Sequence, residues 1–337
     1  MIYITYKKRV LGENEAPDML AMDPHSSAQL LLFILLGLLL SQLAETILHR
    51  YHVHAIPGSG AVMLIGILTG FIMAGINREW EAQLEFDEHL FALILLPIII
   101  FQSGYSLPLS HFFKRLFKIL VYAFVGTGIT TLFVGLSLFG ISETGVLGEN
   151  LKFGIWEAMA FASLISAIDP VATLCTFGAL QVEPSLSITI MGESVINDAV
   201  SLALYKTFEH FIEAGEAVHI GGQIIYFLEL VIVSSILGVL TGMLCSFQLR
   251  QIPIRIGVNM QATAILLWSY VAYAISEAFG LSGIISSISA GIIMNHYCKK
   301  NLLMEQREYI DKLLAMMANF CEMAIFCMAG ISIAFYR

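Results

Sequence analysis

The chain has 337 residues, of which 58% are hydrophobic and only 13% are charged, and its mean hydropathy is +0.81. Ordinary soluble domains do not reach this composition, so the sequence predicts an all-α, polytopic membrane helix bundle embedded in a lipid bilayer. The net charge of −9 argues against nucleic acid as a partner.

Residues 1–25 are expected to form a polar N-terminal tail without the apolar run of a signal peptide, and residues 26–337 a membrane transporter domain. Apolar runs long enough to cross a bilayer predict about ten spans. These spans are expected near residues 28–48, 57–76, 88–105, 117–139, 155–180, 186–209, 222–247, 258–279, 281–297 and 314–336.

The gaps between these spans predict the orientation of the chain. Lysine and arginine gather in the odd-numbered gaps, as Lys114, Arg115 and Lys118 do in the third, whereas the even-numbered gaps are acidic. By the positive-inside rule the odd-numbered gaps are cytoplasmic, and the N-terminus is extracytoplasmic or lumenal. The protein is therefore expected in the plasma membrane or an endomembrane as a multi-pass protein.

The fifth expected span contains a carboxylate directly before a proline, Asp169-Pro170, in an apolar run. Proline removes a backbone hydrogen bond and disfavours helix at the residue before it, so the helix is expected to break there. Irregular backbone at membrane depth is tolerated where it is buried in protein or lines a cavity. Broken helices of this kind form cation sites in many transporters.

The sixth expected span contains two further carboxylates, Glu193 and Asp198. Helical spacing places Glu193, Asn197 and Ser201 on one stripe, and Ser194 with Asp198 on the neighbouring stripe. A carboxylate in the middle of a bilayer costs about 2.5–3.5 kcal/mol on insertion scales. Two of them in one span therefore require a proton, a cation, water or another partner.

One more acid, Glu322, lies in the tenth expected span. The sequence leaves two interpretations open for it: a protonated residue of helix packing, or a functional partner of the other acids.

An aspartate at this depth can hold a proton or a small hard cation, but not both at once. If the loaded site can face either side of the membrane and the empty, charged site cannot cross, the result is obligatory exchange. Oxygen ligands from Asp198, the Asn197 amide, Ser194 and a carbonyl near Asp169 would suit Na⁺ or K⁺.

Two linked segments carry a resemblance to a known family. Residues 167–172 (Ala-Ile-Asp-Pro-Val-Ala), followed by residues 192–200 (Gly-Glu-Ser-Val-Ile-Asn-Asp-Ala-Val), closely resemble the paired signature of eukaryotic sodium/proton exchangers in the monovalent cation/proton antiporter superfamily. Further similar segments lie at residues 95–105, 205–209, 281–284 and around Glu322 and 330–332, so the resemblance covers nearly the whole chain from about residue 28.

The resemblance implies an antiporter fold of inverted repeats and a homodimer. It implies that Asp198 carries the ion or the proton beside Asn197, that Asp169 lies at a helix crossover, and that Glu193 is structural. The Asn-Asp order is similar to that of the electroneutral branch. The expected function is thus electroneutral exchange of Na⁺ or K⁺ for H⁺, regulating pH and cation content, with no enzymatic step and no cofactor.

The chain also departs from the family pattern. Pro97 is followed by Ile98 where relatives often have a second proline. The family has about three further spans, one of which supplies an arginine that pairs with the equivalent of Glu193, so the sequence is expected to lack the last spans and the cytoplasmic tail.

Two other classes of protein are alternatives to the antiporter. A cation channel or a non-transporting membrane scaffold would follow if later spans were absent. An intramembrane protease is disfavoured because Asp169 and Asp198 lack the matched setting that a catalytic acid pair needs.

Overall fold

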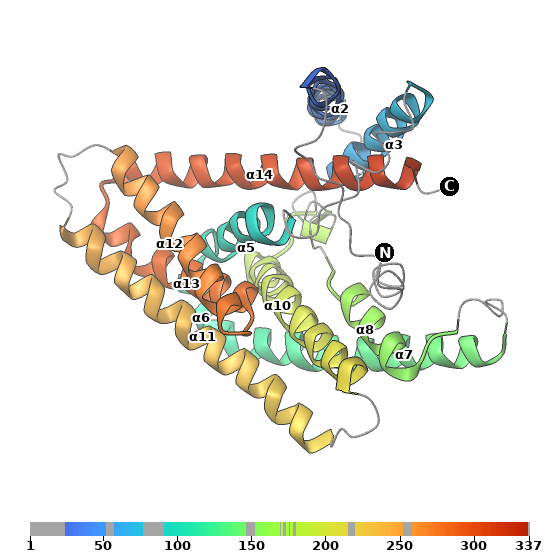
Figure 1. Cartoon of the computed structure of the whole chain (residues 1–337). Helices are drawn as coiled ribbons and strands as arrows, with labels where there is room; N and C mark the ends of the chain where they lie inside the picture. The colour runs from blue at the N-terminus through green and yellow to red at the C-terminus, as the bar shows by residue number, and fades with distance from the viewer. Residues whose placement is uncertain are drawn as a thin grey trace. The chain divides into compact units, whose positions relative to one another are not determined.

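A computed structural model of the chain describes the backbone of residues 24–51, 57–76, 91–145, 152–168, 170, 173–174, 176–177, 180–214, 220–251 and 258–335. Almost all of the expected N-terminal tail, and Asp169, lie outside these residues. The described part is helical, as the composition predicted (Figure 1).

The main helices follow one another with short connections. They are α2 (Pro24–Arg50), α3 (Gly58–Ile76), α5 (Leu96–Tyr105), α6 (Leu109–Val121), α7 (Thr127–Glu143), α8 (Ile155–Ile165), α10 (Pro184–Ala214), α11 (Ile220–Gln251), α12 (Val258–Ala278), α13 (Gly283–Tyr297) and α14 (Met304–Phe335). Two π-helical turns, η2 (Phe91–Leu95) and η3 (Tyr122–Gly126), precede α5 and α7, and a short 3₁₀ turn, η5 (Lys299–Asn301), precedes α14.

The chain divides into two compact units. The first contains α2, α3 and the end of α14 from Glu322 onward. Its apolar core joins Leu38 of α2, Val62 and Met73 of α3, and Cys327 and Ile331 of α14.

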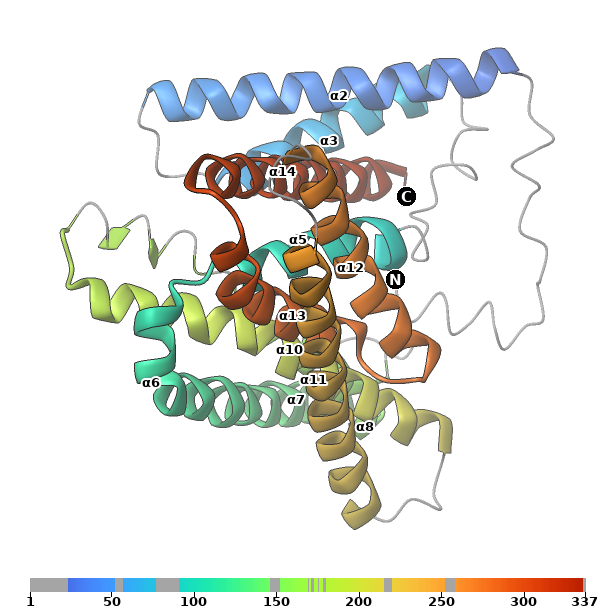
Figure 2. The same cartoon turned by 90° about the vertical axis from the view of Figure 1, so that its left-hand side faces the viewer.

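The second unit, Ala92–Cys321, contains the remaining helices and all the polar residues singled out above except Glu322. Within it, α13 packs against both α11 and α5, while α8 packs against α7 and α10 (Figures 1 and 2). One apolar cluster joins α5, α11, α12, α13 and the start of α14. A second cluster joins α10 to α6, α11 and α13, and this cluster positions the candidate site.

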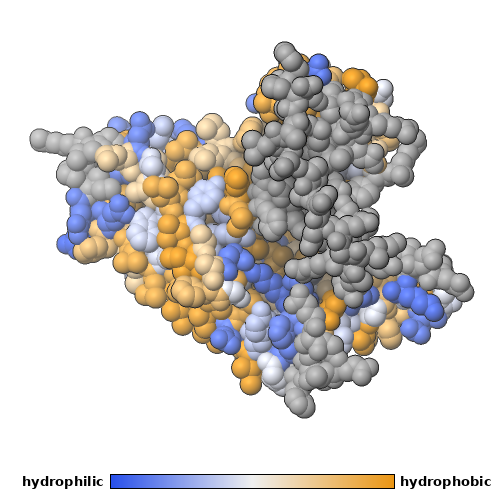
Figure 3. Space-filling model, in the orientation of Figure 1, coloured by the Kyte–Doolittle hydropathy of each residue, from blue (hydrophilic) through white to orange (hydrophobic). Residues whose placement is uncertain are grey.

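Six helices among the described residues are long and apolar enough to cross a membrane. They are Gln29–Leu48, Gly58–Ile76, Leu109–Glu143, Gly221–Gln251, Val258–Ala278 and Met304–Phe335. Only 17–39% of each apolar stretch is buried in the described protein, as is typical of helices that face lipid or other apolar partners. Figure 3 shows large apolar areas on the described surface of one face.

The helix break predicted in the fifth span is confirmed for the described residues around Asp169. The helix α8 ends at Ile165, and Ala167, Ile168 and Pro170 are not helical. The fourth span differs from its expected bounds, because α6, η3 and α7 form a continuous helical run of 35 residues that begins at Leu109 rather than near residue 117. The charges of α6 lower its mean hydropathy, which hides its helical character from a hydropathy reading.

Glycines allow α11 and α13 to pack with their backbones in contact. A side-chain Cβ added at Gly238 would lie against the backbone carbonyl oxygen of Ser286 and 2.8 Å from Cβ of Ser289. Small residues at such crossings are typical of membrane helix packing.

Replacing Gly238 by alanine should destabilise the protein, because crowding in a tight core costs about 1–3 kcal/mol. Gly222→Ala is the matched control on the same helix, since nothing lies within 4 Å of a Cβ at Gly222. Thermal unfolding in detergent should show a lower midpoint for G238A and an unchanged or higher one for G222A, and equal midpoints would contradict the close packing.

Candidate functional site

The helix α10 has two different faces. Val195, Ala199 and Ala203 belong to the apolar cluster shared with α6, α11 and α13. Ser194, Asn197 and Ser201 lie on another side, and their exposed fractions are 5%, 3% and 0%. Polar groups that are buried without partners are costly, so Ser194, Asn197 and Ser201 need hydrogen-bond partners on the neighbouring helices.

Asn197 is held by a hydroxyl from α7. Thr127 donates its hydroxyl hydrogen to Oδ1 of Asn197 over 2.8 Å, and each residue is only 3% exposed. Glu193, one helical turn before Asn197 and half-buried, is a side-chain hydrogen-bond partner of the same residue. Because the amide oxygen accepts from Thr127, the amide NH₂ is the group of Asn197 that can donate to the Glu193 carboxylate.

The position of Thr127 follows from a change in the helix before it. The π-helical turn η3 ends at Gly126, and Thr127 is the first residue of α7. A π-helical turn changes the direction in which the following side chains point, and such turns are frequent at functional sites.

A second set of buried hydroxyls lies one helical turn further along α10. Ser201 lies 3.1 Å from the hydroxyl of Ser166, which lies 3.2 Å from that of Thr131. The carbonyl oxygen of Ser163 accepts hydrogen bonds from both Ser166 and Ser201. All of these groups are buried, so α7, α8 and α10 are joined by polar contacts within an otherwise apolar unit.

The end of α8 lies next to α10. The hydroxyl of Ser194 donates to the backbone carbonyl oxygen of Ile168 over 3.2 Å. Ile168 directly precedes Asp169 in the sequence. The structure thus brings Ser194 together with a carbonyl beside Asp169, as the proposed ligand set required, whereas Asp169 itself lies outside the described residues.

Asp198 follows Asn197 directly on α10 and is half-buried. Its carboxylate therefore belongs to the same helical turn as the Asn197 amide and the Ser194 hydroxyl. Glu322 is half-buried on α14 and belongs to the other compact unit.

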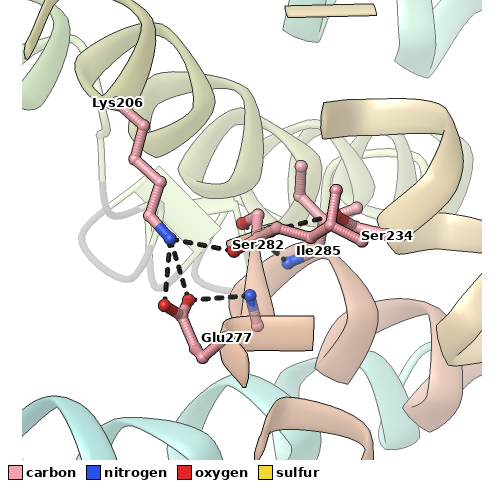
Figure 4. A network of polar contacts seen from close by, with 7 residues as sticks. Lys206, Ser234, Glu277, Ser282 and Ile285 are labelled. Carbon is pink, nitrogen blue, oxygen red and sulfur yellow. Dashed lines mark hydrogen bonds and ion pairs between the residues drawn. The ribbon is translucent and has the colours of Figure 1, made fainter. Parts of the chain in front are cut away.

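Further along α10, Lys206 forms an ion pair that the sequence did not indicate. Its Nζ lies 2.9 Å and 3.1 Å from the two carboxylate oxygens of Glu277 at the end of α12, and 3.1 Å from the carbonyl oxygen of Leu281 (Figure 4). Glu277 also accepts a hydrogen bond from the backbone N–H of Gly283, the first residue of α13, over 2.9 Å. The pair connects α10 to the turn between α12 and α13.

A comparison with protein families decides the classification of the chain. The family described as "Sodium/hydrogen exchanger, transmembrane" matches residues 32–336. The chain belongs to the sodium/hydrogen exchanger family. The resemblance inferred from residues 167–172 and 192–200 is confirmed.

Individual relatives agree with this. Sodium/hydrogen exchanger 8 of Rattus norvegicus is 34% identical over 320 residues, which are 92% of this chain and 55% of that protein. Sodium/hydrogen exchanger 2 of Oryctolagus cuniculus is 32% identical over 325 residues, or 95% and 39% of the two chains. The chain thus spans about half the length of exchanger 8 and less of exchanger 2.

A solved structure supports the fold. The sodium proton antiporter MjNhaP1 from Methanocaldococcus jannaschii at pH 8 superposes with a TM-score of 0.70 over 89% of this chain and 69% of its own, at 18% identity. The predicted helical cation/proton antiporter fold is therefore confirmed.

Thr127 and Thr131, which contact Asn197 and Ser166, were not predicted from the sequence. Their spacing could have indicated a polar contact, because the two hydroxyls lie four residues apart in an apolar span and so share one helical face.

Thr127→Val should destabilise the protein, because the Asn197 oxygen loses its buried donor at a cost of about 1–3 kcal/mol. Thr130→Val makes the same chemical change on α7, at a residue outside these buried polar contacts. Thermal unfolding in detergent should show a lower midpoint for T127V than for T130V. An equal effect of both would mean that the Thr127 hydroxyl does not hold Asn197.

A double-mutant cycle tests the ion pair on α10. Both side chains are about 30% exposed, so Lys206→Glu alone should cost on the order of 1 kcal/mol or more through repulsion of Glu277. The reversed pair Lys206→Glu with Glu277→Lys should recover part of this loss in unfolding measurements. If the double variant lost as much as the sum of the single variants, the two side chains would not be coupled.

Proposed function

We propose that the protein exchanges Na⁺ or K⁺ for H⁺ across a membrane as an electroneutral antiporter, with Asp198 as the group that carries either ion. Membership in the sodium/hydrogen exchanger family supports this proposal. Exchanger 8 and MjNhaP1 are a named sodium/hydrogen exchanger and a named sodium proton antiporter.

The observation that carries the proposal is the position of Asp198 in a polar segment of an apolar unit. Asn197 and Ser194, on the same turn of α10, are each tied to a neighbouring element: Asn197 to Thr127, and Ser194 to the carbonyl of Ile168. Hydroxyl, amide and carbonyl oxygens are ligands that suit hard alkali cations. An oxygen that accepts one hydrogen bond retains a second lone pair for a cation.

Competition at one carboxylate would couple the two ions. A Na⁺ ion at Asp198 neutralises the carboxylate with the help of neighbouring oxygens, and a proton neutralises it without them. The neutral loaded forms can change the side to which they are exposed, whereas the bare carboxylate is held back by the cost of a charge at membrane depth. One cation then moves in exchange for one proton, and no net charge crosses the membrane.

The other acids have supporting roles in this proposal. Asp169 would supply a further oxygen at the broken helix next to Pro170, as broken helices do in other transporters. Glu193 holds Asn197 in place, and Glu322 is a structural acid of the first unit. The protein carries out no chemical reaction and needs no cofactor.

The remaining features follow from the sequence. We propose that the protein is a homodimer with its N-terminus on the extracytoplasmic or lumenal side, and that it regulates pH and cation content.

Transport by vesicles that contain the purified protein tests the proposal. An outward Na⁺ or K⁺ gradient should acidify the vesicle interior through the wild type, without a voltage on a potential-sensitive dye. Asp198→Asn keeps the shape of the side chain and removes its charge, so it should reduce this flux to the background of empty vesicles.

Glu209→Gln is the matched control, because Glu209 is an exposed carboxylate at the far end of the same helix. It should transport at close to the wild-type rate. Normal exchange by D198N would overturn the role of Asp198, and a current driven by the cation gradient alone would identify a channel instead.

A further inference from the structure

An apolar cavity lies against the back of the helix that carries Asp198. It has a volume of about 290 Å³, is partly open to the outside of the protein, and is lined by α6, η3, α10, α11 and α13. Leu116 of α6, Ala199 of α10 and Val239 of α11 are among its lining residues. Ser235, one of its few polar lining residues, donates its hydroxyl hydrogen to the carbonyl of Val231. Apolar cavities of about half this size stay dry and take up apolar molecules.

One wall of the cavity is an amphipathic helix with a basic face. Phe112, Phe113, Leu116 and Leu120 of α6 line the cavity. Helical spacing places Lys114, Arg115 and Lys118 on the other side of this helix. Lys114 and Lys118 are exposed, and in the described part of the chain none of the three basic side chains pairs with a carboxylate.

The length of the helical run places these charges at the membrane surface. The helical run from Leu109 to Glu143 has 35 residues, whereas about 20 residues cross a hydrocarbon core that is roughly 30 Å thick. The charged first turns of the run therefore extend to the level of the lipid headgroups, on the side that the positive-inside rule makes cytoplasmic.

Aromatic residues connect the basic face to the cavity. Phe117 is 80% exposed and lies one helical turn from both Phe113 and Lys114. Phe113 is 50% exposed and also lines the cavity. An apolar path thus runs over the surface of α6 from Lys114 to the cavity.

We propose that this region binds an anionic phospholipid of the cytoplasmic leaflet. Its phosphate lies against Lys114, Arg115 and Lys118, and one acyl chain passes Phe117 and Phe113 into the cavity. A lipid supplies both the negative charge that the basic face lacks and the apolar chain that the cavity accepts. Basic residues near a membrane surface attract anionic lipids in this way, and amphipathic helices bind such membranes through both faces.

The occupied cavity would lie behind Ile196 and Ala199, which flank the Asn197-Asp198 pair on α10. Lipid binding can be measured without transport, so the proposal is independent of the exchange activity.

Photo-crosslinking with two lipids tests the proposal. The full chain is placed in phosphatidylcholine vesicles that contain a trace of either phosphatidylglycerol or phosphatidylcholine with a diazirine in one acyl chain. After illumination, the labelled peptides are identified by mass spectrometry. The wild type should be labelled on the cavity-lining peptides of α6, α10, α11 and α13, and about tenfold more by the anionic lipid than by phosphatidylcholine.

Variants separate the two parts of the site. K114Q/R115Q/K118Q should reduce the ratio of anionic to neutral labelling at the cavity toward one. V239W should fill the cavity and remove labelling there by both lipids. L240W places the same side chain on the neighbouring residue of α11, which is 50% exposed, and should leave the labelling unchanged.

Equal labelling of the wild-type cavity by both lipids, absence of label there, or an unchanged ratio in the triple-glutamine variant would each overturn the proposal. The triple variant alters only surface side chains of α6, so it keeps the test decisive if V239W does not fold.

Discussion

Polar groups at membrane depth must find their partners inside the protein, and the second unit is organised by this requirement. Thr127 binds Asn197, and Thr131 belongs to a second set of buried hydrogen bonds with Ser166 and Ser201. Each of these groups would be costly if it were buried alone. Together they fix the angle at which α10 presents Asn197 and Asp198 to the broken end of α8.

The two faces of α10 make different contacts. The apolar face packs on α6, α11 and α13 and fixes the depth of the helix. The polar face contacts α7 and the end of α8, where backbone carbonyls are free of regular helix. A rigid helix with a polar face beside irregular backbone is an arrangement in which a cation can exchange its water for protein oxygens.

Much of this arrangement could be predicted from the sequence, because it depends on local patterns. Apolar runs predicted the helices, and Pro170 predicted the end of α8. Helical spacing placed Asn197 and Ser201 on one stripe of α10 and Ser194 on the neighbouring stripe. The start of α6 was missed since its charges mask a helix that is apolar on one face. Lys206 and Glu277 are 71 residues apart, so their pairing depends on tertiary packing and cannot be seen in a local sequence pattern. The choice of Thr127 as the partner of Asn197 has the same origin.

The contacts of Glu277 couple two helices mechanically. The carboxylate neutralises Lys206 of α10 and also receives the first backbone amide of α13, where a negative charge favours the helix start. An axial displacement of α10 must therefore either stretch a charged contact or pull the first turn of α13 with it. The single carboxylate thus acts as a tether that limits how far the helix bearing Asp198 can slide on its own.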